Sequence, residues 1–165
     1  ETMSRFDVLR KLPAELLAQI EHAILHHNLA ELPQIDCLES SLFAKLLRDA
    51  DKLDIWNTVI TYYYRDDQNT RNPTLELNLP DSEQVTQEVV DALLNQEIVD
   101  NRKLQSLNDF KLLQLGWVFD VNFPPTFELI MERSYLSRIR NTLPDSPLID
   151  RAYSCVLTYI QQRLQ

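Results

Sequence analysis

The sequence predicts an all-α protein, a single-domain bundle of about six to seven helices. Gly116 is the only glycine in 165 residues, although hairpins, bulges and phosphate-binding loops need glycine for positive φ or close backbone approach. Apolar residues recur at steps of three and four over most of the chain, which is the helical period. Polar or proline-containing segments separate these stretches.

The first two helices are expected over residues 13–28 and 42–65. Pro13 lies in the first turn of the earlier helix, where a missing backbone N–H is tolerated. His27 continues the apolar stripe of that helix, and His26 lies beside it. The later helix is the longest in the chain, and its length and periodicity make it the central one.

Residues 75–79 alternate between leucine and polar side chains and are expected to form an extended connector. Four more helices follow this connector. They are a helix capped by Asp81 or Ser82 that ends near Asn95, a helix over 107–118 opened by a Ser106–Asp109 capping box, a helix begun by Pro124 and Pro125 that carries Ile139, and a helix from Ile149 to Leu164. The first two of these four are expected to be structural.

The composition argues against several classes of function. The net charge is −9, and acids outnumber bases both in residues 1–67 and in residues 68–165. A surface that binds a nucleic-acid polymer is therefore not expected. Cys37 and Cys155 have no metal-ligand spacing and predict free thiols in a reducing cytosol. No apolar run reaches the roughly 20 residues of a membrane span and no signal peptide is visible, so we expect a cytoplasmic protein. The sequence does not fix the oligomeric state.

The central helix carries three acids in six residues, at Asp49, Asp51 and Asp54. Asp51 shares a helical stripe with the apolar residues one turn before and one turn after it, which predicts a carboxylate on the buried face. Such a carboxylate needs a cationic partner, either a basic side chain or a metal ion. Asp49 has lysines four residues before and three residues after it, the spacing of a solvated surface pair. We therefore interpret Asp51 as part of a site and Asp49 as scaffold.

His27 has two interpretations. A histidine near a helix end can bond a backbone carbonyl as a buried or capping imidazole. A neutral imidazole is also a good ligand for zinc, manganese, iron or nickel, and an acceptor then orients it through its other nitrogen. Asn28 and Asp54 are the candidates for that support.

The segment Arg48-Asp49-Ala50-Asp51-Lys52-Leu53-Asp54, preceded by His27-Asn28, carries a family resemblance. It resembles the C-terminal half of the signature of the HD-domain metal-dependent phosphohydrolases, a family of all-helical proteins. The resemblance continues through residues 119–124 and 132–136, so it covers most of the chain.

The resemblance implies roles for individual residues. Asp51 matches a metal ligand, and His27 falls where some members supply an extra imidazole for a second metal. Lys52 would meet the substrate phosphate, although the surface pair with Asp49 is an alternative for its side chain. The other residues expected to bind substrate or support the ligands are His26, Asn28, Asp54 and Arg48.

The implied activity is hydrolysis of a phosphorylated small molecule or nucleotide by a water molecule that a divalent metal (Mn, Fe, Ni, Zn or Mg) activates. The family's first histidine and its His-Asp doublet are missing before His22. We therefore expect the C-terminal portion of a longer HD domain, with residues 1–67 as a core holding half of the site and residues 68–165 as a helical extension packed on it. The alternative is a member whose site has decayed, acting as a helical interaction domain or as a nucleotide sensor without turnover.

Overall fold

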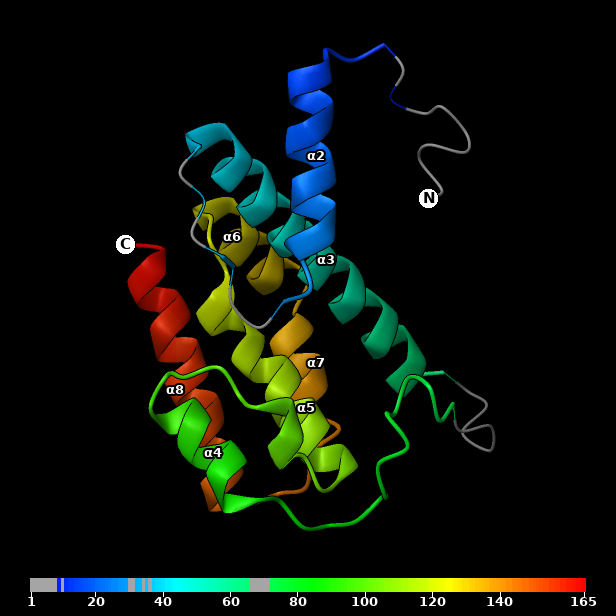
Figure 1. Ribbon diagram of the computed structural model, residues 1–165. Coiled ribbons are helices and arrows are strands. Elements are labelled where there is room, and N and C mark those ends of the chain that lie inside the picture. The colour runs from blue at the N-terminus through cyan, green and yellow to red at the C-terminus, as the bar shows by residue number, and fades with distance from the viewer. Residues whose placement is uncertain (1–8, 10, 30–31, 34, 36, 66–71) are drawn as a thin grey trace. The chain divides into compact units, whose positions relative to one another are not determined.

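The structure is a computed structural model that describes residues 9, 11–29, 32, 33, 35, 37–65 and 72–165. Within these residues all regular secondary structure is helical, which confirms the predicted fold class (Figure 1). The α-helices are α2 (Ala14–His26), α3 (Leu38–Tyr63), α4 (Gln87–Leu94), α5 (Leu107–Gly116), α6 (Pro124–Glu132), α7 (Tyr135–Arg140) and α8 (Pro147–Arg163), and the 3-10 helices are η1 (Asn101–Lys103) and η2 (Trp117–Asp120). None of the described helices has the length and apolar character needed to cross a bilayer.

The chain forms two compact units, residues 1–51 and residues 52–165, and the boundary falls inside α3. Trp56, Val59 and Ile60, in the second half of α3, belong to the apolar core built by the later helices, which is why the boundary of the compact units lies inside α3. The expected organisation, a core over residues 1–67 with a helical extension over 68–165, stays a prediction.

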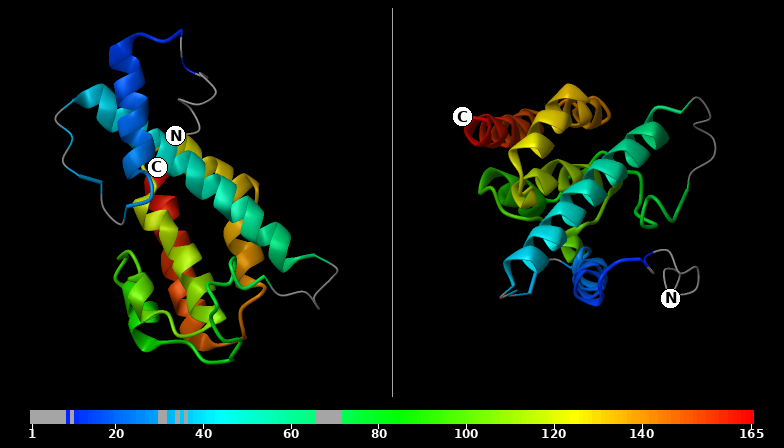
Figure 2. Two further views of the ribbon diagram at one scale, coloured as in Figure 1. Left: turned by 45° about the vertical axis from the view of Figure 1, so that its right-hand side comes forward. Right: turned by 90° about the horizontal axis from the view of Figure 1, so that it is seen from above.

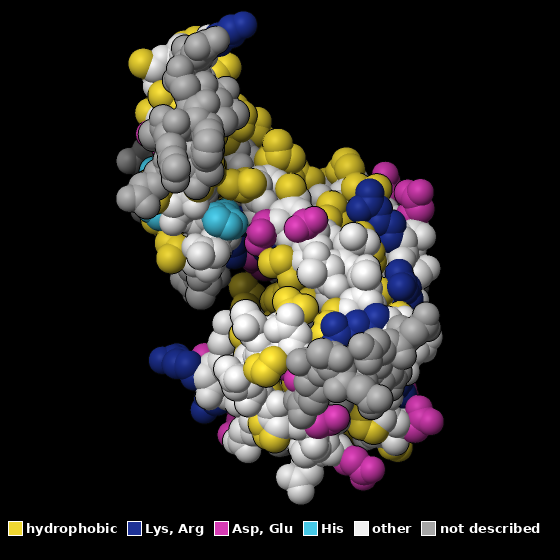
Figure 3. Space-filling model, turned by 90° about the vertical axis from the view of Figure 1, so that its right-hand side faces the viewer, with side chains coloured by type: hydrophobic (Ala, Val, Ile, Leu, Met, Phe, Trp, Pro, Cys, Tyr) yellow, Lys and Arg dark blue, Asp and Glu magenta, His cyan; other side chains and the backbone are white. Residues whose placement is uncertain are grey.

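The first unit contains α2 and the first half of α3. The backbone N–H of Ser41 bonds the Cys37 carbonyl at 3.0 Å, so α3 begins earlier than the predicted residue 42. Ala23 is almost fully buried, whereas several leucines of this unit lie on its surface. These are Leu25, Leu38, Leu42 and Leu46, with exposed fractions of 71, 87, 50 and 55%. Figure 3 shows one face of the molecule on which apolar side chains reach the surface.

The second unit is built around one apolar core, to which the second half of α3 and helices α4 to α8 contribute. Helices α4, α5 and α8 lie side by side (Figure 1, Figure 2). Trp56 is fully buried, and its indole N–H donates a hydrogen bond to the Gln114 carbonyl oxygen at 2.9 Å. Its ring lies 5.9 Å from that of Trp117 and 6.2 Å from that of Tyr135. This cluster joins α3 to α5, η2 and α7.

The segment before α4 lies along the first residues of α5. Three alternate carbonyls of that segment accept hydrogen bonds from α5 and its N-cap. The pairs are Leu107 N with Pro80 O at 3.0 Å, Asn108 Nδ2 with Ser82 O at 2.7 Å, and Ser106 Oγ with Gln84 O at 3.0 Å. Because these carbonyls are engaged outside a helix, α4 begins only at Gln87, with Thr86 at its N-cap. The prediction that Asp81 or Ser82 caps this helix was therefore wrong.

The predicted capping box at the start of α5 is present. Ser106 Oγ accepts a hydrogen bond from the Asp109 backbone N–H, and Asp109 Oδ2 accepts one from the Ser106 N–H, each at 3.1 Å. The Asp109 carboxylate also accepts from the Gln105 N–H at 2.9 Å and from the backbone N–H and hydroxyl of Thr86, each at 2.7 Å. Asp109 is fully buried. One carboxylate thus satisfies backbone donors at the N-termini of both α4 and α5.

The helix predicted from Pro124 through Ile139 is divided into α6 and α7. Ser134, which lies between them, has φ 55° and ψ 32°, the left-handed conformation that an α-helix does not accommodate. The two helices still place Phe127, Ile130 and Ile139 in the core as expected.

The connector at residues 75–79 is turned rather than extended. Leu77 and Asn78 have φ values of 53° and 57°, and the Asn78 N–H bonds the Pro73 carbonyl at 2.8 Å. Gly116, in contrast, has a helical φ of −69°. In the described residues the left-handed backbone conformation is adopted by residues other than glycine. The position of glycine in the sequence therefore does not indicate where these turns occur.

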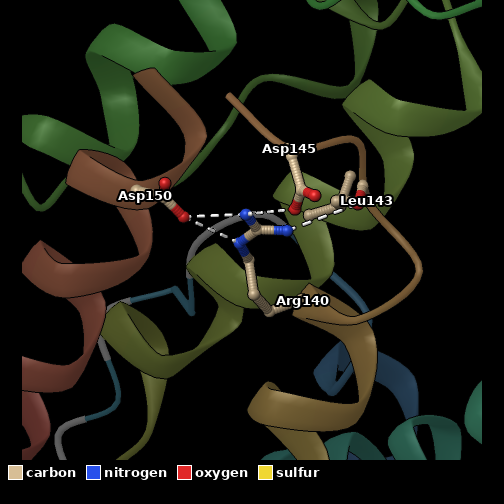
Figure 4. Close-up of polar contacts among 4 residues, drawn as sticks. All are labelled: Arg140, Leu143, Asp145 and Asp150. Carbon is tan, nitrogen blue, oxygen red and sulfur yellow. Dashed lines mark hydrogen bonds and ion pairs between the residues drawn. The ribbon is translucent and has the colours of Figure 1, made fainter. Parts of the chain in front are cut away.

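Arg140 joins the end of α7 to the start of α8 (Figure 4). Its guanidinium bonds Asp150 Oδ1 through Nη2 at 2.7 Å and through Nε at 3.2 Å, and Nη1 bonds the Leu143 carbonyl at 3.3 Å. Asp145 makes a longer contact of 3.5 Å with the same group. Because Asp150 and the Leu143 carbonyl already accept hydrogen bonds from this guanidinium, we interpret Arg140 as a structural residue and not as a residue that binds an anionic ligand.

Candidate functional site

Arg48 links α3 to the C-terminal end of α2 within the first unit. Its Nη1 donates hydrogen bonds to the carbonyl oxygens of His27 at 2.9 Å and Leu29 at 2.6 Å. Carbonyls at a helix end lack partners within the helix, and a buried cation is well suited to satisfy them. Arg48 is only 4% exposed, which strengthens both contacts. Arg48, which was predicted to support the site, therefore binds the backbone of His27, the predicted metal ligand. Arg48 lies one helical turn before Asp51 on α3.

His27 lies at the C-cap of α2 and makes the backbone contact that one of its two interpretations requires. Its Nδ1 lies 2.8 Å from the Ile24 carbonyl oxygen. A carbonyl accepts only from a protonated nitrogen, so this contact assigns the proton to Nδ1 and leaves the Nε2 lone pair available. Metal-bound histidines are commonly held in this way through their other nitrogen. The capping contact is therefore compatible with ligand chemistry at Nε2.

The exposures of Asp49 and Asp51 differ from those expected. Asp49 is 1% exposed and Asp51 is half-buried, so the interpretation of Asp49 as a solvated surface residue was wrong. Several buried positions of α3 come one residue after the positions that were predicted to face inward, for example Lys52 instead of Asp51. The buried positions of α3 are Ser40, Ala44, Arg48, Asp49, Lys52, Trp56, Val59 and Ile60. A helical face with charged side chains at three of its buried positions is not recognisable from apolar periodicity alone.

Lys52 forms an ion pair within the second unit. Its Nζ lies 2.6 Å from Asp120 Oδ2, and the two side chains are 11% and 23% exposed. Asp120 ends η2 and belongs to residues 119–124, one of the segments that carry the family resemblance. Sequence reasoning considered only nearby acids as partners of Lys52 and missed this one, which lies far along the chain.

The remaining predicted residues take no part in these two contacts. Asn28 and Asp54 are exposed. His26 is half-buried, and its Nδ1 lies 2.7 Å from the carbonyl oxygen of His22, on the preceding turn of α2. The structure thus brings Arg48 to the His27 backbone and Lys52 to Asp120.

Two of the predicted site residues carry atoms of metal-ligand type. His27 offers an imidazole nitrogen and Asp51 a carboxylate oxygen, which are ligand types used for zinc, manganese, iron and nickel. No group of three or more His, Cys, Asp or Glu residues that could hold a metal ion occurs in the described ranges. A functional centre of this kind therefore needs further ligands beyond these two.

A polar cluster that the sequence did not reveal lies between α3 and α5. The Tyr63 hydroxyl donates to Gln114 Oε1 at 3.0 Å, and Lys111 Nζ donates to the Thr142 carbonyl at 2.9 Å. Lys111 Nζ also lies 5.4 Å from the centre of the Tyr63 ring. Burial lowers the pKa of Lys111 and raises the pKa of Tyr63. The signal in the sequence is a lysine and a glutamine three residues apart, in a part of α5 whose other residues, from Phe110 onward, are apolar or glycine.

We expect the stability of the protein to fall above about pH 10, where a free tyrosine ionises. Burial raises the pKa of Tyr63, so the folded state keeps its hydroxyl neutral while the unfolded chain loses the proton. The contribution is complete below the unfolded pKa and is lost as the pH rises above it. Urea unfolding at about pH 8 and about pH 11 should show a smaller alkaline loss for Tyr63→Phe than for the parent protein. Tyr64→Phe is the control, because Tyr64 is half-exposed and directly follows the end of the same helix. An equal change in both variants would contradict the assignment.

Charges on the described surface are mixed in sign. On the face drawn in Figure 3, both acidic and basic side chains are exposed. The net charge of the whole chain is −9. The expectation that no nucleic-acid polymer binds stays a prediction.

Comparison with known proteins does not assign this geometry to a family. No family model matches the chain, and neither the curated proteins nor the solved structures give a significant match. Function is therefore inferred from the contacts of His27, Arg48 and Lys52, from the position of Asp51 on α3 and from the resemblance of residues 48–54 to the HD signature.

Proposed function

We propose that this protein is a metal-dependent phosphohydrolase of the HD type, which acts on a phosphorylated small molecule or a nucleotide. The observation that best supports the proposal is the pair of hydrogen bonds from Arg48 to the carbonyls of His27 and Leu29. These bonds attach the helix end that carries His27 to α3, one turn before Asp51. On this proposal His27 Nε2 and the Asp51 carboxylate are two of the metal ligands, and the others come from outside the residues described here.

The proposed chemistry needs no protein nucleophile. A bound divalent metal lowers the pKa of its water ligand and neutralises phosphate oxygens. Lys52 binds the substrate phosphate, and the ion pair with Asp120 at 2.6 Å positions its ammonium group. An ammonium has three N–H donors, so an ion pair with one carboxylate leaves donors for a phosphate oxygen.

Replacing Asp51 with alanine should remove bound metal while leaving the fold largely unchanged. The carboxylate is a proposed ligand, but its side chain is only half-buried, so truncation opens no large cavity. Metal content is measured by elemental analysis after incubation of the full chain with manganese, and activity with a panel of phosphate esters and nucleotides in manganese, nickel or magnesium. Both are expected to be lost in Asp51→Ala.

Glu39→Ala is the matched control, because Glu39 is an exposed acid of the same helix with no proposed role at the site. Its metal content should equal that of the parent protein. Unchanged metal content in Asp51→Ala would reject the ligand assignment.

The alternative is a catalytically inactive HD-like domain that binds a partner or senses a nucleotide. The exposed leucines of the first unit, Leu25, Leu38, Leu42 and Leu46, favour it, because exposed apolar side chains are typical of interaction surfaces. Parent protein that retains no manganese would support an interaction domain. Metal or nucleotide binding without turnover in the phosphatase panel would support a sensor.

A further inference from the structure

A pair of imidazoles lies on α2, and the proposed function uses neither of them as a metal ligand. His22 and His26 are four residues apart, so they lie one above the other on the same face of the helix. Their ring centroids are 4.2 Å apart, and the ring planes are inclined by 33°. Both side chains are half-buried. The helix therefore holds two imidazoles side by side at a partly solvated position.

The ring of His26 is oriented by a backbone contact. Its Nδ1 lies 2.7 Å from the His22 carbonyl oxygen, which accepts the Nδ1 proton. The proton is thereby assigned to Nδ1, and Nε2 keeps its lone pair. A histidine that ligates a metal commonly donates its other N–H to a backbone carbonyl, which fixes the tautomer and the ring orientation.

The ring of His22 is less constrained. Its Nδ1 is buried and has no hydrogen-bond partner among the described residues. An unpartnered buried nitrogen is unfavourable, and a ligand that takes its lone pair would remove that cost. Rotation about the last side-chain torsion of histidine is soft, so a small turn of the ring can direct a nitrogen towards the ion that His26 contacts.

We infer that His22 and His26 form a two-imidazole chelate for a divalent transition-metal ion of the Ni²⁺, Cu²⁺ or Zn²⁺ type. Histidines at i and i+4 on one helical face are a known geometry for binding zinc, and imidazole suits nickel and copper as well. No third acid, cysteine or histidine completes a ligand group here within the described ranges. Water molecules fill the remaining positions, so the ion is bound exchangeably. This inference does not depend on the proposed phosphohydrolase activity.

The test is a titration of the full chain with Ni²⁺ at mildly alkaline pH, where a free imidazole is neutral, followed by calorimetry. The parent protein should take up Ni²⁺ at this pair, and His22→Gln and His26→Gln should each weaken that binding by about tenfold or more. Glu21→Gln is the control, because Glu21 is an exposed residue of the same helix and is adjacent to His22. It should keep the affinity of the parent.

Electron paramagnetic resonance of the Cu²⁺ complex gives an independent readout. The parent spectrum should show coupling to two imidazole nitrogens, and that of His22→Gln to one. Thermal unfolding without metal verifies that each variant is folded. Equal Ni²⁺ affinity in the parent, His22→Gln and His26→Gln would overturn the inference.

Asp51→Ala separates this inference from the proposed function. The His22–His26 pair should bind Ni²⁺ equally well in that variant and in the parent. Loss of Ni²⁺ binding in Asp51→Ala or His27→Gln, with binding retained in His22→Gln, would assign the ion to the phosphohydrolase site and reject the chelate. Loss of manganese in Asp51→Ala with retained Ni²⁺ uptake would support both proposals.

Discussion

Replacement of Trp56 with alanine is expected to lower the free energy of unfolding by about 5 kcal/mol, the upper end for a large buried aromatic residue. Trp56 is fully buried at the contact of α3 with the later helices. Truncation leaves a cavity against the rings of Trp117 and Tyr135, which lie 5.9 and 6.2 Å away. It also leaves the Gln114 carbonyl without the indole donor that bonds it at 2.9 Å. Urea unfolding followed by far-ultraviolet circular dichroism measures the change.

Trp56→Phe keeps the experiment interpretable if the alanine variant does not fold. Phenylalanine retains an aromatic ring but has no N–H, so we expect a loss of about 1 to 3 kcal/mol from the smaller volume and the unsatisfied carbonyl. Trp117→Ala is the control for tryptophan truncation, since Trp117 is only half-buried. A Trp56→Ala variant as stable as Trp117→Ala would contradict the central position assigned to Trp56.

Replacement of Asp109 with alanine is expected to cost about 4 kcal/mol of unfolding free energy, because it leaves several buried donors without an acceptor. The carboxylate accepts from the backbone N–H groups of Gln105, Ser106 and Thr86 and from the Thr86 hydroxyl. These groups lie at the starts of α4 and α5, so both helix ends lose their caps at once. Urea unfolding again gives the magnitude.

Asp100→Ala is the matched control for Asp109→Ala. Asp100 also accepts a backbone N–H at a helix start, from Arg102 at 2.9 Å, but its side chain is partly exposed. Hydrogen bonds from Arg102 lower the pKa of Asp100 to about 2, and water can replace them when the carboxylate is removed. We expect a much smaller destabilisation than for Asp109. Similar losses in the two variants would show that burial is not what makes Asp109 important.

Most helices could be predicted from the sequence, because apolar periodicity is a local property. The Ser106–Asp109 capping box is an example, since both partners lie within one helical turn and the pattern names them. The start of α4 was not predictable in this way. The carbonyls before it bond residues of α5 that lie some 20 positions later, and no local pattern reports such contacts.

The residue types of the candidate site can be read from the sequence, but their contacts cannot. Arg48, Asp51 and Lys52 form an unusually charged group on the central helix, and His27 precedes that helix. The sequence did not reveal that Arg48 and Lys52 face inward on α3, because charged residues are read as solvated unless their partners are known. Those partners are the His27 and Leu29 carbonyls for Arg48 and Asp120 for Lys52, all distant in sequence.

The packing of α4 against α8 has a consequence for biosynthesis. Helix α4 covers residues 87–94, yet its most extensive helix contact is with residues 147–163, and the Cys155 thiol also lies 3.5 Å from the Leu94 carbonyl. A ribosome adds about 5 to 20 residues per second, so α4 emerges some seconds before its neighbour exists. During that interval its apolar side is open to chaperones and to other nascent chains. Folding of the second unit is therefore completed after translation has passed α8, not progressively as each helix emerges.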